Sequence, residues 1–297
     1  MVRVPKQLIY NMSATHKPVL SVPSGSTLVF ETCDCFEDQI TSEQTPFQAL
    51  DWARINPATG PVFIEGADPG DMLEIKIEKM VLRDHGVMVT GPDMGILGDE
   101  LTENSIRIIP IRKGEAFFRE DVKIRLNPMI GVIGTAPVGE DISCGTPGRH
   151  GGNMDCKVIG EGTTLYLPVN VPGGLLALGD LHAAMGDGEV SVCGVEVSGE
   201  VTLSVVVIKG KQWALPFLKS SKAIYMIASE KSLDDATTRA TKNMVHFLVN
   251  ECALSSDDAI TLLSIAGNLQ ICQIVDPLKT VRMELPLSIL DQLGYTF

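Results

Sequence analysis

Aromatic side chains and basic residues are both scarce in this sequence of 297 residues. Phe, Trp and Tyr make up 5% of it, so it has few of the stacking surfaces that hold single-stranded nucleic acid. Lys and Arg number 24 against 37 Asp and Glu, a formal net charge of −13. An acidic chain without a basic cluster repels phosphate backbones. We therefore expect no nucleic-acid partner.

Long apolar runs and paired cysteines are missing as well. The longest apolar stretches, such as residues 201–208, are far shorter than the ~20 residues that cross a bilayer. Residues 1–10 lack the apolar segment and cleavage site of a secretory signal. The seven cysteines form an odd count without paired spacing, and Cys33 and Cys35 are expected to be structural. The sequence predicts a soluble, cytoplasmic protein with no membrane partner.

Short strand-like runs broken by Gly and Pro fill the sequence from residue 17 to about 210. Met72–Leu82 alternates apolar and charged residues, as a half-buried strand does. Residues 189–208 contain two such runs around Ser198 and Gly199, which indicates a hairpin. This part of the chain is therefore predicted to be rich in β-strands.

Helical signals begin only after residue 210. Ser232 and Ser255 are each followed three residues later by an aspartate, as in an acidic capping box. A late strand is predicted at Val281–Leu285. We expect an α+β fold with a β-rich, β-sandwich-like body over residues 1–210 and a C-terminal α/β portion over residues 211–297.

Asp180 and His182 are the most informative pair of polar residues. If residues 179–183 are the end of a strand, both side chains project from the same face and can converge on one metal ion. Asp187 and Glu189 repeat this spacing, although there a solvated turn before a strand explains the pattern as well. Capping of a neighbouring loop remains the alternative for Asp180.

A glycine-rich segment, GTPGRHGGNMD at residues 145–155, is the second concentration of polar residues. Its backbone N–H groups can form a nest for an anion or an oxyanion. It contains neither GxxxxGK[ST] nor GxGxxG, so a nucleotide phosphate loop is not predicted. Arg149, His150, Asn153 and Asp155 within one short segment favour a site over a flexible loop.

Three weaker candidates lie elsewhere. Asp34 follows an alternating strand and can deliver a carboxylate at its end, with turn formation as the alternative. Glu65 adjoins an apolar run, where a raised pKa would suit a general base, although an exposed loop acid is the commoner case. Cys144 with His150 is a possible thiolate pair. No GxSxG serine motif is present.

Seven segments together match the motifs of one known family: 16–18, 59–71, 134–137, 146–155, 167–173, 178–189 and 195–200. Through these segments the chain resembles the acetamidase/formamidase family of amide hydrolases. The resemblance implies hydrolysis of a small linear amide, formamide or acetamide, to a carboxylate and ammonia. It also implies a homo-oligomer, either a homodimer or a homotetramer.

For such a reaction we hypothesise a divalent cation held by Asp34, Asp180 and His182. Zinc suits imidazole better than calcium does, so zinc is preferred and calcium is the alternative. Glu189 or Asp187, with Glu65 as a substitute, would take the proton of a water molecule and return it to nitrogen.

The glycine-rich segment would bind the substrate. In this hypothesis the N–H groups of Gly151 and Gly152, beside His150, bind the oxyanion, and Asn153 and Asp155 orient the amide. Two other functions remain open: a non-catalytic small-molecule binding protein, and a metal-dependent hydrolase of a longer or cyclic amide.

Overall fold

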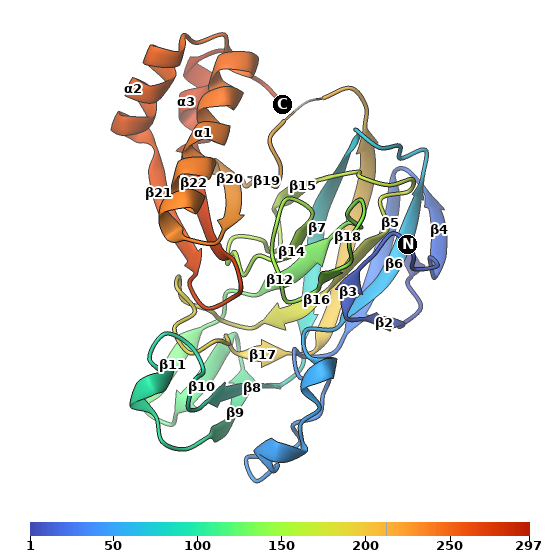
Figure 1. Cartoon of the computed structure of the whole chain (residues 1–297), viewed down its shortest axis with the longest axis vertical. Helices are drawn as coiled ribbons and strands as arrows, with labels where there is room; N and C mark the ends of the chain where they lie inside the picture. Colours follow the sequence, from blue (N-terminus) through green and yellow to red (C-terminus); the bar gives the residue numbers. More distant parts are fainter. Residues whose placement is uncertain (212) are drawn as a thin grey trace.

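The computed structural model describes residues 1–211 and 213–297, and two large β-sheets dominate it (Figure 1). The first sheet has nine strands in the order β1-β5-β18-β7-β15-β19-β20-β22-β21. In that order they span Val2–Arg3, Ser26–Thr32, Gly199–Ile208, Met72–Leu82, Thr164–Pro168, Phe217–Lys219, Ala223–Glu230, Lys279–Pro286 and Asn268–Gln273.

The second sheet has eleven strands, eight of them on the path β11-β10-β9-β8-β17-β16-β12-β14. These span Val122–Arg125, Glu115–Arg119, Ser105–Arg112, His85–Thr90, Glu196–Val197, Leu176–His182, Met129–Gly134 and Gly151–Asn153. Strand β6 (Ala58–Glu65) pairs with β16, and β2 (Leu8–Ile9) and β4 (Leu20–Pro23) pair with β6. Strands β3 (Asn11–Met12) and β13 (Ile142–Ser143) form a separate pair.

Three helices gather at one end of the molecule beside β20, β21 and β22 (Figure 1). They are α1 (Leu233–Cys252), α2 (Ser256–Ala266) and α3 (Leu287–Gln292). The hydroxyls of Ser232 and Ser255 accept the backbone N–H groups of Asp235 and Asp258, as the capping pattern predicted. Within the described residues no helix has the length and apolarity needed to span a membrane.

Short 3₁₀ turns complete the chain at Phe47–Ala49, Trp52–Arg54 and Gly98–Glu100. The predicted α+β class is confirmed: strands fill the body and helices occur near the C-terminus. The nine-stranded sheet runs through both parts, because β19, β20, β22 and β21 extend it beyond β15. The two predicted portions therefore share one sheet.

The predicted hairpin at residues 189–208 is wrong. Strand β17 pairs with β16 and β8, whereas β18 pairs with β5 and β7 in the other sheet. The chain crosses between sheets at Ser198. Glu196 is directly opposite His182 in the ladder, so a buried carboxylate faces an imidazole there.

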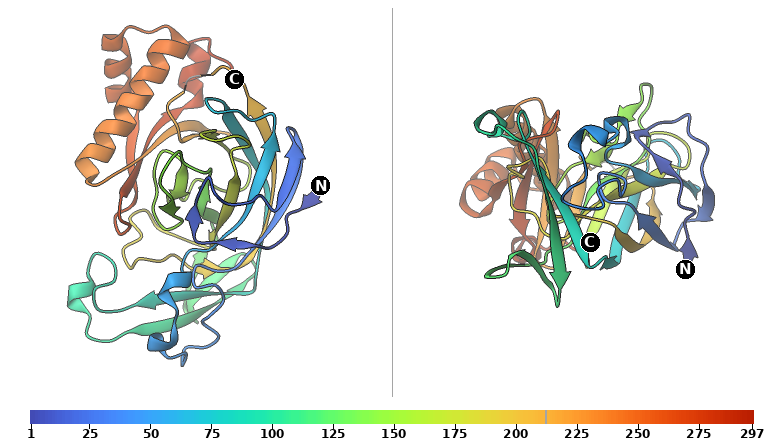
Figure 2. Two further views of the ribbon diagram at one scale, coloured as in Figure 1. Left: turned by 45° about the vertical axis from the view of Figure 1, so that its right-hand side comes forward. Right: turned by 90° about the horizontal axis from the view of Figure 1, so that it is seen from below.

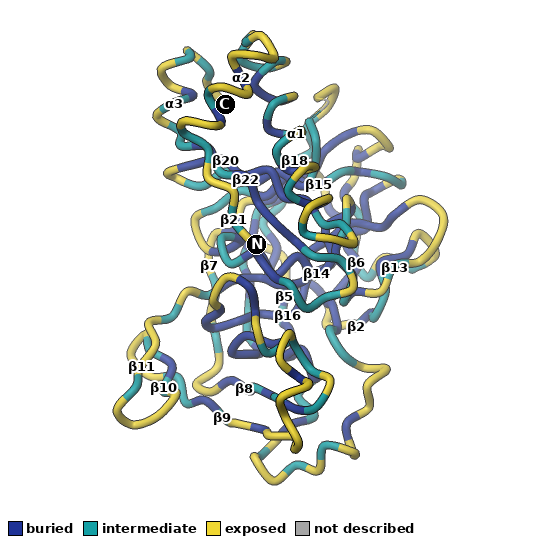
Figure 3. Tube along the Cα trace, turned by 60° about the vertical axis from the view of Figure 1, so that its left-hand side comes forward, coloured by how far each residue is buried: buried dark blue, intermediate teal, exposed yellow. Residues whose placement is uncertain are grey.

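Strand β16 runs through the interior of the molecule, and every one of its residues is buried (Figure 3). It pairs with β12 on one side and with β6 and β17 on the other. The apolar members of its sequence, LALGDLH, suit a strand that is covered on both faces. Asp180 and His182 are polar exceptions at its end. Turned views show this region between the helical end and the β8–β11 end (Figure 2).

Candidate active site

The side chains of Asp180 and His182 meet at the end of β16. Asp180 Oδ1 lies 3.5 Å from His182 Nε2, and both side chains are almost fully buried. Regular alternation is not what brings them together, because Asp180 has a left-handed backbone with φ of 54°. The structure thus joins the two residues that the sequence paired, through a distorted strand end.

Three further carboxylates surround the same imidazole nitrogen. Glu196 Oε1 is 3.1 Å from His182 Nε2, Asp155 Oδ1 is 3.8 Å away and Glu189 Oε1 is 4.0 Å away. We call Asp155, Asp180, His182, Glu189 and Glu196 the acidic cluster. All five side chains are buried, and four potential negative charges face a single imidazole.

Many oxygen atoms of the acidic cluster have no hydrogen-bond partner in the described residues. They are both carboxylate oxygens of Asp155, Oδ1 of Asp180, and Oε2 of Glu189 and of Glu196. Buried polar groups are nearly always satisfied in folded proteins, so this concentration indicates a ligand with positive charge.

The electrostatics of the cluster point the same way. Burial, together with the charges of neighbouring acids, raises the pKa values of Asp155, Glu189 and Glu196 well above their usual range. Although burial opposes it, the carboxylates of Glu196 and Asp180 raise the pKa of His182 well above its usual value. A bound cation would relieve this repulsion and favour the ionised carboxylates.

Backbone strain is concentrated in the cluster. Asp155, Asp180 and Glu189 have φ values of 42°, 54° and 50°. Left-handed conformations at non-glycine residues cost roughly 1–3 kcal/mol each and gather at functional sites. The fold therefore holds three carboxylates in place at a cost in stability.

Gly131 of β12 makes room for two of these carboxylates. A Cβ atom at this position would lie 2.5 Å from Asp155 Oδ1 and 2.6 Å from Asp180 Oδ2. Any larger residue must push both acids away from their present positions.

We expect Gly131→Ala to lower the turnover number by at least about ten-fold, because misplacing reacting groups by ~1 Å costs that much or more. The matched control is Gly186→Ala, where a Cβ atom would meet nothing within 4 Å. Steady-state kinetics of both variants check this, and equal activity of Gly131→Ala and the wild type would contradict it.

A small cavity of about 100 Å³ opens onto the acidic cluster. Asp180, His182, Glu189 and Glu196 line it, as do Asn153 and Asp276 from other segments. Asn153 Nδ2 donates to Asp276 Oδ2 at 3.1 Å, and Asn153 Oδ1 has no partner. A cavity of this size has room for a molecule of only a few heavy atoms.

The structure does not bring Asp187 into the cluster. Arg282 Nη1 and Nη2 donate to Asp187 Oδ1 and Oδ2, each at 2.8 Å, and Lys157 Nζ lies 2.9 Å from Oδ2. Although partial burial opposes it, these cations lower the pKa of Asp187. An acid of lowered pKa is a poor proton acceptor, and the ion pair instead anchors the loop that carries Glu189.

Glu65 also lies apart from the cluster. It is exposed at the end of β6, where Ser21 Oγ donates to its Oε1 at 2.9 Å. The register pairs Val62 with Leu176, so Glu65 extends beyond the start of β16 whereas His182 is at its end. This exposed position agrees with the alternative that the sequence left open for Glu65, an exposed acid without a catalytic role.

Asp34 is buried beside the cluster but is occupied by its own turn. Its Oδ1 accepts the N–H groups of Phe36 at 2.9 Å and Asp38 at 2.8 Å. Burial raises its pKa to about 6, with a contribution from the charge of Asp180. Cys35, expected to be structural, has its sulfur within 4.8 Å of ligand atoms of Asp180 and Glu196.

The glycines proposed to form an oxyanion site are engaged in the fold. Gly151 N–H donates to the Gly148 carbonyl at 3.1 Å, and Gly152 is opposite Ile133 in the β12–β14 ladder. The Gly151 N–H group is therefore not available to an oxyanion. His150 is buried, and burial lowers its pKa to about 4. It lines a different, larger cavity.

Sequence reasoning missed Glu196 and Asp276. Glu196 carried a usable signal, since it is an acid between Val195 and Val197 in a strand that is otherwise apolar. Asp276 carried none, because it comes from the loop between β21 and β22, far along the chain from β16.

Comparison with known proteins identifies the family. The model of the acetamidase/formamidase family matches residues 13–143 and 140–292. This chain belongs to the acetamidase/formamidase family. The crystal structure of an acetamidase from Bacillus halodurans is 50% identical to it with a TM-score of 0.97, over 98% of this chain and 99% of that one.

More distant members of the acetamidase/formamidase family align with this chain over only part of their length. A formamidase of Methylophilus methylotrophus is 25% identical over 284 residues, 73% of this chain and 70% of that protein. A Schizosaccharomyces pombe relative is 26% identical over 250 residues, which are 64% of this chain and 61% of that relative's length. The resemblance inferred from the sequence is thus confirmed, and segments 146–155 and 178–189 that carried it supply four of the five cluster residues.

Proposed function

We propose that this protein hydrolyses a small linear amide, formamide or acetamide, to a carboxylate and ammonia. The observation that carries the proposal is the acidic cluster, in which four carboxylates lie within 4.0 Å of His182 Nε2 and retain unpartnered oxygen atoms. The adjoining cavity of about 100 Å³ suits a substrate of this size. The family name supports the same two substrates.

The donor set fits a divalent cation. Ligand atoms around one tetrahedral ion lie about 3.4 Å apart, and Asp180 Oδ1 and Asp155 Oδ1 are 3.5 and 3.8 Å from His182 Nε2. These three residues would hold the cation, in place of the predicted set with Asp34. Imidazole together with carboxylates favours zinc, whereas calcium prefers an all-oxygen set. When bound, such a cation supplies Lewis acidity that polarises an amide carbonyl and favours attack by water near neutral pH.

Glu189 would move the protons of the reaction. Its Oε2 is buried and unpartnered, and its Oε1 faces the cluster 4.0 Å from His182 Nε2. In this mechanism Glu189 accepts a proton from the attacking water and delivers it to the departing nitrogen, so that ammonia leaves instead of an amide anion.

Asn153 would orient the amide group. Because its Nδ2 is bonded to Asp276, the amide of Asn153 is held with Oδ1 free to accept a hydrogen bond. The –NH2 group of a primary amide is a donor that Oδ1 can receive, which would place the leaving nitrogen beside Glu189.

We expect Glu189→Gln to lower the turnover number by about 10²-fold or more, because glutamine cannot accept a proton. Exposed Glu120 provides the matched control as Glu120→Gln. Turnover numbers of the two variants decide the matter, and an unchanged value for Glu189→Gln would remove Glu189 from this role.

Ammonia release separates the proposed enzyme from its alternatives. Product from formamide or acetamide supports hydrolysis, whereas saturable binding heat without product would identify a binding protein. A series of amides of increasing acyl length distinguishes a hydrolase of longer amides. Each added methylene group changes the transition-state free energy that sets kcat/KM by only about 1–3 kcal/mol, so the preferred length emerges from the whole series.

We further propose a cytoplasmic location and a homodimer or homotetramer. The location is supported by the seven cysteines, all of them free thiols. The assembly rests on the family resemblance, and light scattering of the purified protein tests it.

A further inference from the structure

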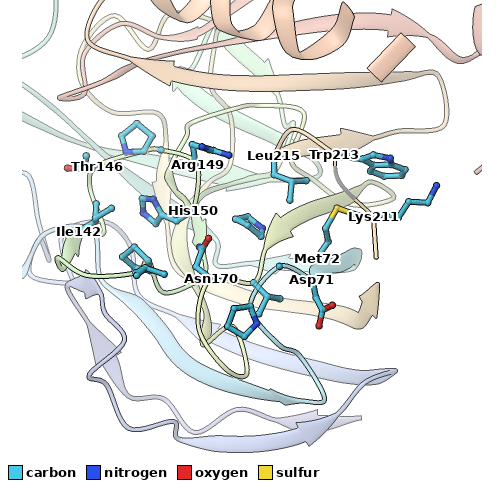
Figure 4. A pocket seen from close by; sticks show the side chains of 18 of the residues that line it. Asp71, Met72, Ile142, Thr146, Arg149, His150, Asn170, Lys211, Trp213 and Leu215 are labelled. Atoms are coloured by element: carbon cyan, nitrogen blue, oxygen red, sulfur yellow. The ribbon is translucent and has the colours of Figure 1, made fainter. Parts of the chain in front are cut away.

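A second and much larger cavity, of about 740 Å³, lies on another side of the glycine-rich segment (Figure 4). Thr146–His150 line it, whereas Asn153 lines the acidic cavity, so one segment borders both. The two cavities have no lining residue in common. Its volume is in the range of pockets that bind small organic molecules. The proposed hydrolysis of formamide or acetamide makes no use of it.

Among the charged side chains that line this cavity, Arg149 is the one without an ion-pair partner in the described residues. Asp71 is paired with Lys209 at 2.6 Å, and Lys211 is paired with Glu251 at 3.0 Å. Arg149 is an exposed residue of this lining, and it has neither an ion pair nor a side-chain hydrogen bond to any other residue within 1–211 and 213–297. Although the net charge of −13 opposes anions in general, an unpaired guanidinium in a concave site attracts an anionic group locally.

Two other residues of the same lining each carry an unpartnered nitrogen atom. His150 Nε2 and Trp213 Nε1 are buried without a hydrogen-bond partner in the described residues, and the His150 residue is only 4% exposed. Figure 4 shows Arg149 and His150 on one side of the cavity and Trp213 on the other. Indole N–H is a donor only, and neutral imidazole offers one donor. His150 therefore carries an unpartnered nitrogen atom on the same side of the cavity as Arg149, where the acceptor atoms of a ligand would lie.

Apolar side chains form much of the remaining wall. Met72, Val138, Ile142, Leu215 and Leu278 all line the cavity, together with the indole ring of Trp213. A bare inorganic anion would leave this surface uncovered. A ligand with an apolar body and one anionic end would cover it and reach Arg149.

We propose that this cavity binds a small organic carboxylate with an apolar body. Arg149 receives the carboxylate through its planar fork of N–H donors, a geometry that matches two carboxylate oxygens. Trp213 and Leu215 contact the apolar body. Formate and acetate bind more weakly than benzoate, because they leave these apolar side chains uncovered.

Tryptophan fluorescence provides a direct test, because the chain has only Trp52 and Trp213. In a Trp52→Phe background, titration with benzoate is expected to change Trp213 emission saturably. Benzyl alcohol, the neutral analogue, is expected to bind about 10- to 100-fold more weakly, as the loss of a charge-assisted hydrogen bond predicts. Calorimetry on the unmodified protein gives the same ranking without the Trp52 substitution.

Arg149→Gln is expected to remove the preference for benzoate over benzyl alcohol. Exposed Arg125→Gln is the matched control and is expected to bind as the parent does. Benzoate should also still bind after a chelator has removed any cation from the acidic cluster. This result therefore does not depend on whether the proposed hydrolysis is correct. Equal binding of the two ligands, an unchanged benzoate affinity in Arg149→Gln, or no saturable signal by either method would overturn the inference.

Discussion

Replacing His182 with alanine is expected to lower kcat/KM for the preferred amide by about 10³-fold or more, or roughly 4 kcal/mol of transition-state stabilisation. The same variant should lose its bound divalent cation. The reason is geometric: His182 Nε2 is the point toward which four carboxylates converge, at 3.1 to 4.0 Å. Without the imidazole, the cluster loses its nitrogen ligand for a cation. In the absence of a cation, the acids also lose the protonatable group that offsets their mutual repulsion.

The measurement pairs steady-state kinetics with metal analysis of the same protein sample. His246→Ala is the matched control, because His246 is exposed on α1 and lies outside the cluster. Circular dichroism should show an intact fold for both variants. A His182→Ala protein that keeps both its cation and its turnover number would contradict the assignment.

Asp187→Ala is expected to destabilise the protein by about 2–3 kcal/mol, because it leaves the guanidinium of Arg282 buried with fewer acceptors. Arg282 is 2% exposed, and its remaining side-chain partners are Gln270 Oε1 at 2.6 Å and Cys272 Sγ at 3.5 Å. The partial exposure of Asp187 keeps the effect below that of a fully buried pair. A melting temperature lower by roughly 5 °C is the expected reading.

The double variant Asp187→Ala/Arg282→Met provides the control, because removing both charges leaves none unpaired. It should recover much of the lost stability. A double variant as unstable as the sum of its single changes would show that the two charges act independently.

This stability difference should depend on pH. Because the pKa of Asp187 is lowered in the folded protein, its contribution is present above the unfolded value near ~4 and is lost as pH falls through the folded value. The melting temperatures of the wild type and Asp187→Ala should therefore converge below about pH 4.

Local patterns predicted the elements whose stability is local. The predicted strand Met72–Leu82 has the bounds of β7, and its alternation holds from Leu73 to Glu78, where the register against β18 shifts. Ser232 and Ser255 cap α1 and α2 as expected. Pairing between distant strands has no such local signal. The run at residues 189–208 alternates like a hairpin, yet its two strands belong to different sheets: β17 pairs with β16, and β18 pairs with β7.

The candidate site was predictable where its residues share a segment. The sequence paired Asp180 with His182 by their spacing, and the structure brings them together through the left-handed backbone of Asp180 instead of regular alternation. Asp155 and Glu189 were candidates from the two motifs that contain them. Glu196 and Asp276 join the site only through sheet pairing and a loop of the C-terminal part. Spacing also failed to show that Arg282 engages Asp187, since 95 residues separate them.

The spacing of residues also could not show which polar groups are already hydrogen-bonded within the fold. A glycine-rich segment predicts available N–H groups, but the fold uses Gly151 for a bond to Gly148. The turn around Asp34 similarly occupies one oxygen of a carboxylate that the sequence offered to a metal.

The most direct measurement is elemental analysis of the purified protein combined with ammonia release from formamide and acetamide before and after chelation. We predict about one equivalent or more of a divalent cation per chain, loss of activity on its removal and recovery when zinc is restored. Full activity in protein shown by the same analysis to contain no cation would contradict the account.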